Sequence, residues 1–201
     1  MRSARALLVS LFLVAAGCNG VLGIEERSFD PGQTEQLVTC DDYCDLVTTN
    51  CTGEHAVYAS RDTCMGTCAL MDLGSPGESG STVACRLEQA RAAGETGEPA
   101  DHCPIAGPGG RGFCGADCTF FCENLPVVCG DTVEIPAELS GDECVASCEA
   151  LDAKDDDETY SIPADDNEDS RDCRILHLTN ATAAVVPHCT HTIGGPGPCT
   201  P

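Results

Sequence analysis

Cysteine and histidine are the residues whose chemistry stands out in this chain, which has 17 cysteines and 5 histidines among 201 residues. Their side chains can form disulfides, bind a transition metal or, as a thiolate, act as a nucleophile. Sixteen of the cysteines fall into two strings of eight. In chain order these are Cys40, Cys44, Cys51, Cys64, Cys68, Cys85, Cys103 and Cys114, then Cys118, Cys122, Cys129, Cys144, Cys148, Cys173, Cys189 and Cys199.

The two strings have nearly the same spacing. Successive cysteines are separated by 3, 6, 12, 3, 16, 17 and 10 residues in the first string, and by 3, 6, 14, 3, 24, 15 and 9 in the second. Other pairs keep the register: Tyr43 and Phe121, Ser60 and Ser140, Asp62 and Asp142, Arg86 and Arg174, and His102 and His188. Such self-similarity indicates an internal duplication. We predict two modules, at 40–114 and 118–199, with an acidic insertion at 152–172 in the second.

Each module has two C-x3-C motifs, which place two cysteines one turn apart on a helix. Two antiparallel helices of this kind can be bridged twice. This favours four pairs: Cys40–Cys68, Cys44–Cys64, Cys118–Cys148 and Cys122–Cys144. The spacing leaves eight cysteines without an assigned partner, because eight cysteines allow 105 connectivities. These are Cys51, Cys85, Cys103, Cys114, Cys129, Cys173, Cys189 and Cys199.

The elements that carry the cysteines are expected to be helices. Ser60 and Ser140 resemble N-caps, and residues 140–143 fit a capping box. A third helix is expected to start near Thr82 or Cys85, with its counterpart near Cys173. The tails 104–114 and 190–201 are rich in Gly and Pro and are expected to be loops. Pro126 lies where a helix should continue, so that helix is expected to be kinked or to start late.

The predicted fold is therefore a small, disulfide-rich, mainly α protein. Each of its two tandem modules has a disulfide-linked helical hairpin, a third short helix and a Gly/Pro-rich loop tail. Aromatic residues make up only 4% of the chain. Disulfides are the usual compensation for such a poor core in exported domains.

Metal binding is the alternative to disulfide formation. The C-x2-C knuckles of zinc modules and the C-x-x-C-H motif of haem attachment are absent from the sequence, so we expect neither a metal nor another cofactor. His177, His188 and His191 remain candidates for a metal site in the second module. The favoured interpretation of the repeated His102 and His188 is structural hydrogen bonding.

Charged residues suggest two further sites. Arg86 and Arg174 are expected to pair with carboxylates of their own modules, with Asp62 and Asp142 as candidates. Residues 165–169 begin like an EF-hand loop, but Ser170 replaces the required Gly and Leu176 the bidentate Glu. A solvated acidic insertion is favoured over a calcium site.

The N-terminus carries an export signal at residues 1–17, with Arg2 and Arg5 before an apolar stretch at 6–16. Val14-Ala15-Ala16-Gly17-Cys18 resembles the lipobox of bacterial lipoproteins. This resemblance implies cleavage before Cys18 and lipidation of its sulfur and amine. Asn19 favours the outer membrane by the sorting rule of that family. Residues 18–39 are expected to be a flexible tether.

Acidic residues dominate the surface charge. The formal net charge is −23, and removal of Arg2 and Arg5 with the signal would make it about −25. Nucleic-acid binding depends on Lys and Arg at phosphates and is excluded. The G-x-S-x-G, H-E-x-x-H and glycine-rich phosphate motifs are absent from the sequence, so no residue is singled out as catalytic and we do not expect an enzyme.

The chain also resembles two known groups of proteins. The paired C-x3-C motifs are similar in spacing to the helical hairpins of small mitochondrial intermembrane-space chaperones. Residues 18–27, followed by the duplicated module, resemble cysteine-rich lipoproteins of myxobacterial type. We expect a non-enzymatic protein anchored by lipid in the cell envelope, whose modules are structural or contact an unknown envelope partner. The alternative is a periplasmic metal-binding or redox-active protein.

Overall fold

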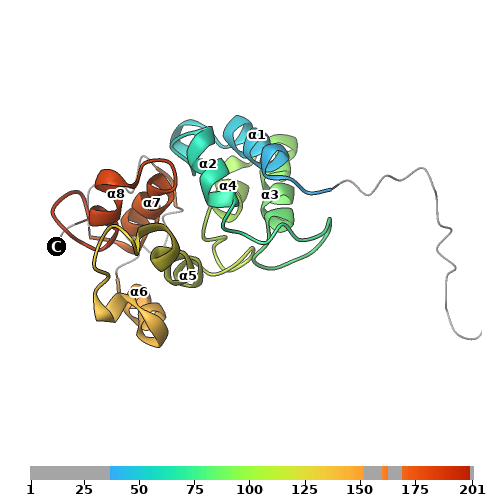
Figure 1. The fold of residues 1–201 in the computed structure, drawn as a ribbon. Helices are drawn as coiled ribbons and strands as arrows, with labels where there is room; N and C mark the ends of the chain where they lie inside the picture. The colour runs from blue at the N-terminus through green and yellow to red at the C-terminus, as the bar shows by residue number, and fades with distance from the viewer. Residues whose placement is uncertain (1–36, 152–159, 163–168, 200–201) are drawn as a thin grey trace, which may run out of the picture. The chain divides into compact units, whose positions relative to one another are not determined.

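Helices make up the regular secondary structure of this protein. The computed structural model describes residues 37–151, 160–162 and 169–199, and in these ranges it has eight α-helices, three short 3₁₀ helices and no β-strand (Figure 1). A single isolated bridge pairs Asp72 with Thr82 in the described ranges. The protein is a small, disulfide-rich, all-α fold, as the sequence predicts.

The first repeat contains α1 (Cys40–Asn50), α2 (Arg61–Cys68), α3 (Val83–Thr96) and α4 (Pro99–Ala106), with a 3₁₀ turn at Gly53–His55. Three of these helices begin after a capping side chain. Thr39, Ser60 and Thr82 each accept a hydrogen bond from the backbone N–H three residues later, which satisfies one unpaired donor of the first turn. Helix α4 begins at Pro99, where the missing N–H of proline costs nothing.

The second repeat has the same order of helices: α5 (Asp117–Cys129), α6 (Cys144–Ala150), α7 (Arg171–Ala181) and α8 (Val185–Thr192). Two 3₁₀ turns, Ala137–Leu139 and Gly141–Glu143, precede α6. Ser170 caps α7 by accepting from the N–H of Cys173, as Thr82 does for α3. The duplication therefore extends from cysteine spacing to secondary structure.

Three local expectations need correction. The capping box at 140–143 does not form, because the Ser140 hydroxyl donates to the carbonyl of Ala137 and the next residues make a 3₁₀ turn. The two tails that were expected to be loops begin in helices. Residues 104–106 belong to α4, and residues 190–192 belong to α8. Helix α5 starts early, at Asp117, and continues through Pro126 to Cys129.

Half-cystines form much of the core, together with a few larger side chains. Tyr43 and Phe121, which share a register position, are both buried. The Tyr43 hydroxyl donates to the carbonyl of Ala106 at 2.6 Å and lies 2.9 Å from the hydroxyl of Tyr58. Burial of the phenol raises the pKa of Tyr58 to about 12. The tyrosine pair therefore links α1 to α4 inside the first repeat.

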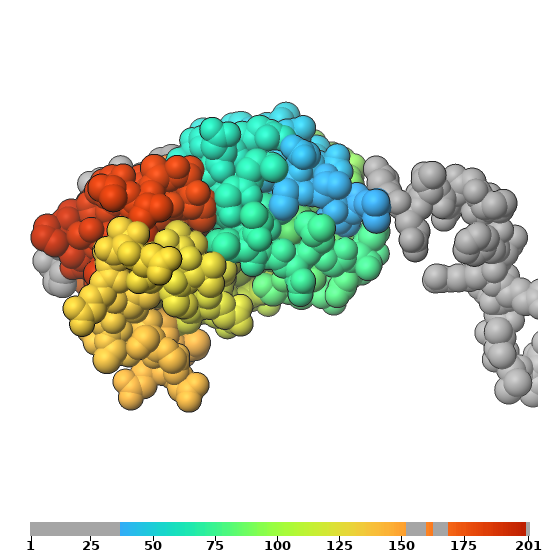
Figure 2. Space-filling model, viewed as in Figure 1, coloured from blue at the N-terminus to red at the C-terminus, as the bar shows by residue number. Residues whose placement is uncertain are grey.

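The two repeats are in contact within one compact unit, Gln36–Pro201. Helix α2 packs against α7, and Figure 2 shows their surfaces meeting. The hydroxyl of Thr182, after α7, donates to the carbonyl of Thr63 in α2. From the insertion, the N–H of Ile162 donates to the carbonyl of Ala56 at 2.8 Å. The end of the insertion is helical, since α7 begins at Arg171.

Candidate functional site

Eight disulfides account for all the cysteines of the two strings. In both repeats the first cysteine is joined to the fifth, the second to the fourth, the third to the seventh and the sixth to the eighth. The pairs are Cys40–Cys68, Cys44–Cys64, Cys51–Cys103 and Cys85–Cys114 in the first repeat, and Cys118–Cys148, Cys122–Cys144, Cys129–Cys189 and Cys173–Cys199 in the second. They include the four pairs that the spacing favours and give partners to the eight cysteines left open.

Three histidines of the second repeat meet where α7 and α8 pack together, which we call the histidine cluster: His177, His188 and His191. Disulfides fix the backbone on both sides of it. His177 lies one helical turn after Cys173, which is bonded to Cys199, and His188 directly precedes Cys189, which is bonded to Cys129 of α5. The cluster is thus held by covalent links to its surroundings.

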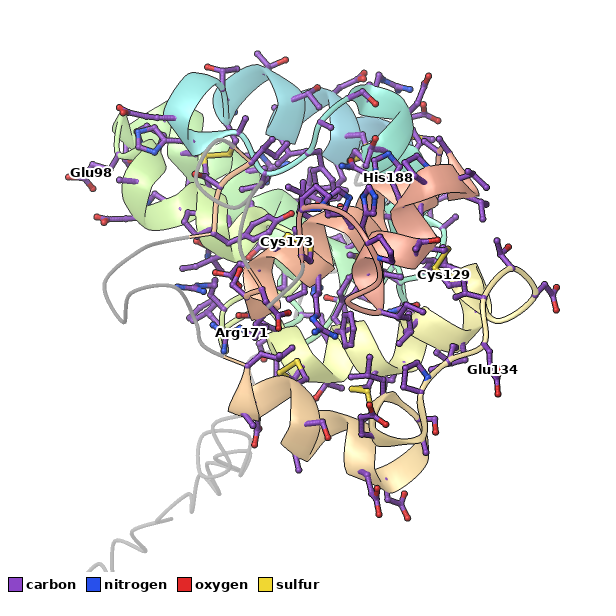
Figure 3. All side chains as sticks on the ribbon, turned by 90° about the vertical axis from the view of Figure 1, so that its left-hand side faces the viewer. Glu98, Cys129, Glu134, Arg171, Cys173 and His188 are labelled. Atoms are coloured by element: carbon purple, nitrogen blue, oxygen red, sulfur yellow. A yellow bond between two sulfur atoms is a disulfide. The ribbon has the colours of Figure 1, made fainter. Side chains whose placement is uncertain are left out.

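The rings of the histidine cluster are in direct contact. The Nδ1 atoms of His177 and His188 lie 2.8 Å apart and share a hydrogen bond. The ring centroids of His177 and His191 are 4.7 Å apart. One nitrogen from each of the three rings lies within 4.8 Å of the others. His177 is buried, whereas His188, labelled in Figure 3, and His191 are half-buried. The cluster therefore reaches from the core towards solvent.

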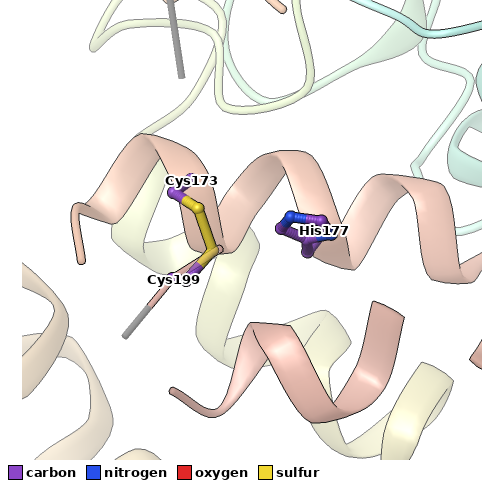
Figure 4. Close-up of side chains that lie close together, drawn as sticks. All are labelled: Cys173, His177 and Cys199. Atoms are coloured by element: carbon purple, nitrogen blue, oxygen red, sulfur yellow. A yellow bond between two sulfur atoms is a disulfide. The ribbon is translucent and has the colours of Figure 1, made fainter. Parts of the chain in front are cut away.

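The Cys173–Cys199 disulfide lies beside His177, as Figure 4 shows. Its sulfur atoms are within 4.8 Å of a nitrogen of His177, so all three residues are potential metal ligands by position. The sulfurs are bonded to each other, however, and only a thiolate is a strong ligand. In the oxidised protein the chemistry available here is that of imidazole.

The first repeat offers an internal comparison for the histidine cluster. His102 stands in register with His188, and its Nδ1 lies 2.9 Å from Oε1 of Gln89. Gln89 is in register with His177, since both lie four residues after the sixth cysteine. Ile105 stands two residues after the seventh cysteine, as His191 does. The same interhelical hydrogen bond is therefore present in both repeats, and the second adds two imidazoles.

Arg174 pairs with a carboxylate of its own module, as predicted, whereas Arg86 donates to backbone carbonyls. Arg86 is fully buried and donates to three backbone carbonyls, those of Thr82, Gly107 and Pro108. Arg174 pairs with Asp169, its Nη2 lying 2.6 Å from the carboxylate. The prediction of Asp62 and Asp142 as partners was wrong, because the tail loop closed by Cys85–Cys114 brings carbonyls to Arg86 and the insertion supplies Asp169.

A cluster of ion pairs joins the two repeats and was not predicted. Arg111, from the first tail, lies 3.6 Å from Asp117 and 3.7 Å from Asp172, and Arg171 lies 3.4 Å from Asp172. Burial raises the pKa of Asp172, while the nearby Arg171 and Arg111 oppose this effect. Only the fold brings these residues together, so sequence spacing carries no signal for them.

Several predicted features lie outside the described residues. These are the export signal at 1–17, the lipidation site Cys18, the tether up to residue 36 and most of the acidic insertion. Asp169, the last acidic residue of the EF-hand-like stretch, is described and is held by Arg174. Among the described helices, none combines the length and apolarity needed to cross a bilayer.

Residues 25–117 match the family model of the BfoA family C-terminal domain. No curated protein and no solved structure matches the chain significantly. The matched range contains the eight cysteines of the first repeat and ends just before Cys118, the first cysteine of the second. The first repeat is therefore similar to a BfoA-family C-terminal domain, and the second repeat has the same order of disulfides as the first.

Proposed function

We propose that this protein is a lipid-anchored component of a bacterial cell envelope, and that its repeats are non-enzymatic structural or interaction modules. The observation that carries this proposal is the repetition of one four-disulfide helical unit. A unit that is duplicated with its disulfide pattern unchanged is suited to presenting a rigid surface twice along one chain.

The disulfides support function in an oxidising compartment. Such bonds persist outside the cytosol and are typical of small exported domains with little core. Their loops span between 20 and 60 residues, and closing a loop of this size stabilises a fold by roughly 3 to 4 kcal/mol in the chain-entropy model, although not additively. The modules should therefore resist unfolding and proteolysis.

The N-terminal sequence supports anchoring by lipid. Acyl chains on Cys18 each contribute about 0.8 kcal/mol per buried methylene, so several chains together give stable attachment. The acidic mature chain disfavours partners rich in phosphate and suits a neutral or cationic envelope partner.

Substitution of Cys18 tests the anchoring. In a bacterial host, Cys18→Ser should abolish both the attachment of lipid and the cleavage after Gly17, because both steps act at this cysteine. Asn19→Asp is the matched control, because it should keep the lipid and redirect the protein from the outer to the inner membrane.

Intact mass spectrometry of the wild type should show loss of residues 1–17 and a lipid on Cys18. A lipid on the Cys18→Ser variant, or an unmodified Cys18 in the wild type, would refute lipid anchoring at this residue.

A further inference from the structure

We propose that His177, His188 and His191 bind one divalent transition-metal ion of the kind that prefers imidazole nitrogen, with Zn²⁺ and Cu²⁺ as the ions to test. Nitrogens of the three rings lie within 4.8 Å of one another on two packed helices. This site goes beyond a structural or interaction role and does not depend on it.

The distances suit a single ion. Ligand nitrogens at about 2.0–2.1 Å from a tetrahedral zinc ion lie roughly 3.3 Å apart. The Nδ1 atoms of His177 and His188 are 2.8 Å apart, which is shorter than this value. The limit of 4.8 Å for nitrogens of all three rings is longer than this value. Small side-chain rotations therefore suffice to bring three nitrogens to one ion.

The donor set also fits such an ion. Neutral imidazole is a ligand for zinc, copper and nickel, and sites with three histidines leave a position for water or another ligand. Nδ1 of His191 is buried and has no hydrogen-bond partner among the described residues. A buried nitrogen without a partner is costly, and a metal bond would satisfy it. The half-buried His188 and His191 give the ion a route from solvent.

The first repeat shows that the fold does not require this cluster. There, Gln89 and His102 make the contact between α3 and α4 with one imidazole, and Ile105 occupies the position of His191. A helix pair of the same type and disulfide pattern is thus built without His177 and His191. The two additional imidazoles of the second repeat call for another role, and metal binding provides one.

The first repeat supplies matched variants for the test. In His177→Gln/His191→Ile the second repeat carries the residues of the first, so the fold should survive while two ligands are lost. The variant keeps every carboxylate and disulfide, so weak cation binding by the acidic surface stays the same. The reverse variant, Gln89→His/Ile105→His, places three histidines in the first repeat.

The experiment is a calorimetric titration of the purified, oxidised protein with Zn²⁺ and, separately, with Cu²⁺, after a thiol assay confirms that all module cysteines are bonded. The wild type should bind one equivalent. His177→Gln/His191→Ile should bind at least about 100-fold more weakly, since each lost ligand costs a metal–nitrogen bond. Gln89→His/Ile105→His should bind a second equivalent.

A measurement on the wild type alone tests the site whether or not the variants fold. The protein has five histidines, and zinc should perturb the ring-proton NMR signals of three, leaving those of His55 and His102 unchanged. Equal affinity of the wild type and His177→Gln/His191→Ile, or zinc-induced shifts confined to other histidines, would overturn the proposal.

Discussion

Arg86 and Arg174 occupy the same position in the two repeats, each directly after the sixth cysteine. Arg86 is fully buried and donates only to backbone carbonyls of the described residues, whereas Arg174 pairs with Asp169. A buried guanidinium is tolerated only when its donors are satisfied. Arg86 therefore fixes the path of the first tail by binding the carbonyls of Gly107 and Pro108.

Substitution of Arg86 tests this role. Arg86→Met keeps the length of the side chain but leaves three buried carbonyls without these donors, so the free energy of unfolding should fall by about 2–4 kcal/mol. Arg61→Met is the control, because the pairs of Arg61 with Asp41 and Asp45 are exposed and screened by solvent. Guanidinium denaturation with intact disulfides measures both. Equal losses in the two variants would contradict the assignment.

Spacing and register predict much of the chemistry at the residue scale. They give the four C-x3-C pairs and the candidate histidines, because a helical turn fixes which side chains share a face. They do not give the acceptors of Arg86, because these are backbone carbonyls, which every residue type has. Gln89 is in register with His177, and His102 is in register with His188. The contact between Gln89 and His102 could therefore have been predicted together with the contact between the two histidines.

At the scale of the elements, equivalent serines have different roles. Ser60 caps α2 by accepting from the N–H of Thr63 at 3.1 Å. Ser140, at the same register, donates instead to Ala137, and α6 begins only at Cys144. Two additional residues between the third and fourth cysteines of the second repeat accompany this difference.

Ser60→Ala should therefore destabilise the protein by about 1 kcal/mol, the usual cost of losing an N-cap. Ser140→Ala should have a clearly smaller effect, because its exposed hydroxyl caps no helix. Denaturation curves of the two variants provide the comparison. A larger loss for Ser140→Ala would show that the 3₁₀ turn before α6 has been assigned wrongly.

The contact between α2 and α7 depends on a glycine. A Cβ at Gly66 would lie 2.5 Å from Oγ1 and 2.8 Å from Cβ of Thr182. Gly66→Ala should destabilise the protein by about 1–3 kcal/mol through this clash, although alanine ordinarily favours a helix. In a double-mutant cycle, Gly66→Ala should cost less free energy of unfolding in the Thr182→Gly background than in the wild type, because Thr182→Gly makes room for the added methyl group. Additive effects would mean that the helices do not meet at these residues.

Helices α4 and α8 are elements that the sequence patterns did not predict. Their sequences contain proline beside Gly-rich segments, which indicates a loop. Pro99 is compatible with a helix because it stands at the first position, where no N–H is needed. Disulfides from Cys103 and Cys189 then hold these short helices against α1 and α5, a tertiary effect that local propensity does not contain.

At the scale of the whole molecule, the ion-pair cluster joins the first tail to α5 and α7. Asp172 is the buried acid of this cluster, and its pKa is raised above the ordinary value of 3.8 mainly by burial. The folded protein therefore holds this proton at a pH where the unfolded chain has released it. By linkage, this group reduces stability as the pH rises from about 4 through its folded pKa.

Asp172→Asn should remove that pH dependence. The free energy of unfolding of the wild type, relative to the variant, should decline as the pH rises above about 4 and become constant once Asp172 is ionised in the folded protein. Parallel denaturation series across this range measure the difference. A relative stability that increases with pH would mean that the arginines outweigh burial at this carboxyl.

The duplicated architecture itself is predictable from the sequence, because sixteen cysteines in two matching strings leave a strong pattern. The contacts between the repeats are not predictable in this way. Gly66, Thr182, Arg111 and Asp172 follow no shared register, and each meets its partner only once both repeats have folded.

The chain contains two copies of one disulfide-bonded helical module. Mass spectrometry of peptides from a digest of the non-reduced protein can test this repetition. We expect eight cross-links, all within a repeat, joining the first cysteine to the fifth, the second to the fourth, the third to the seventh and the sixth to the eighth. A cross-link between the repeats, a different order in one of them, or free thiols among the sixteen cysteines would contradict it.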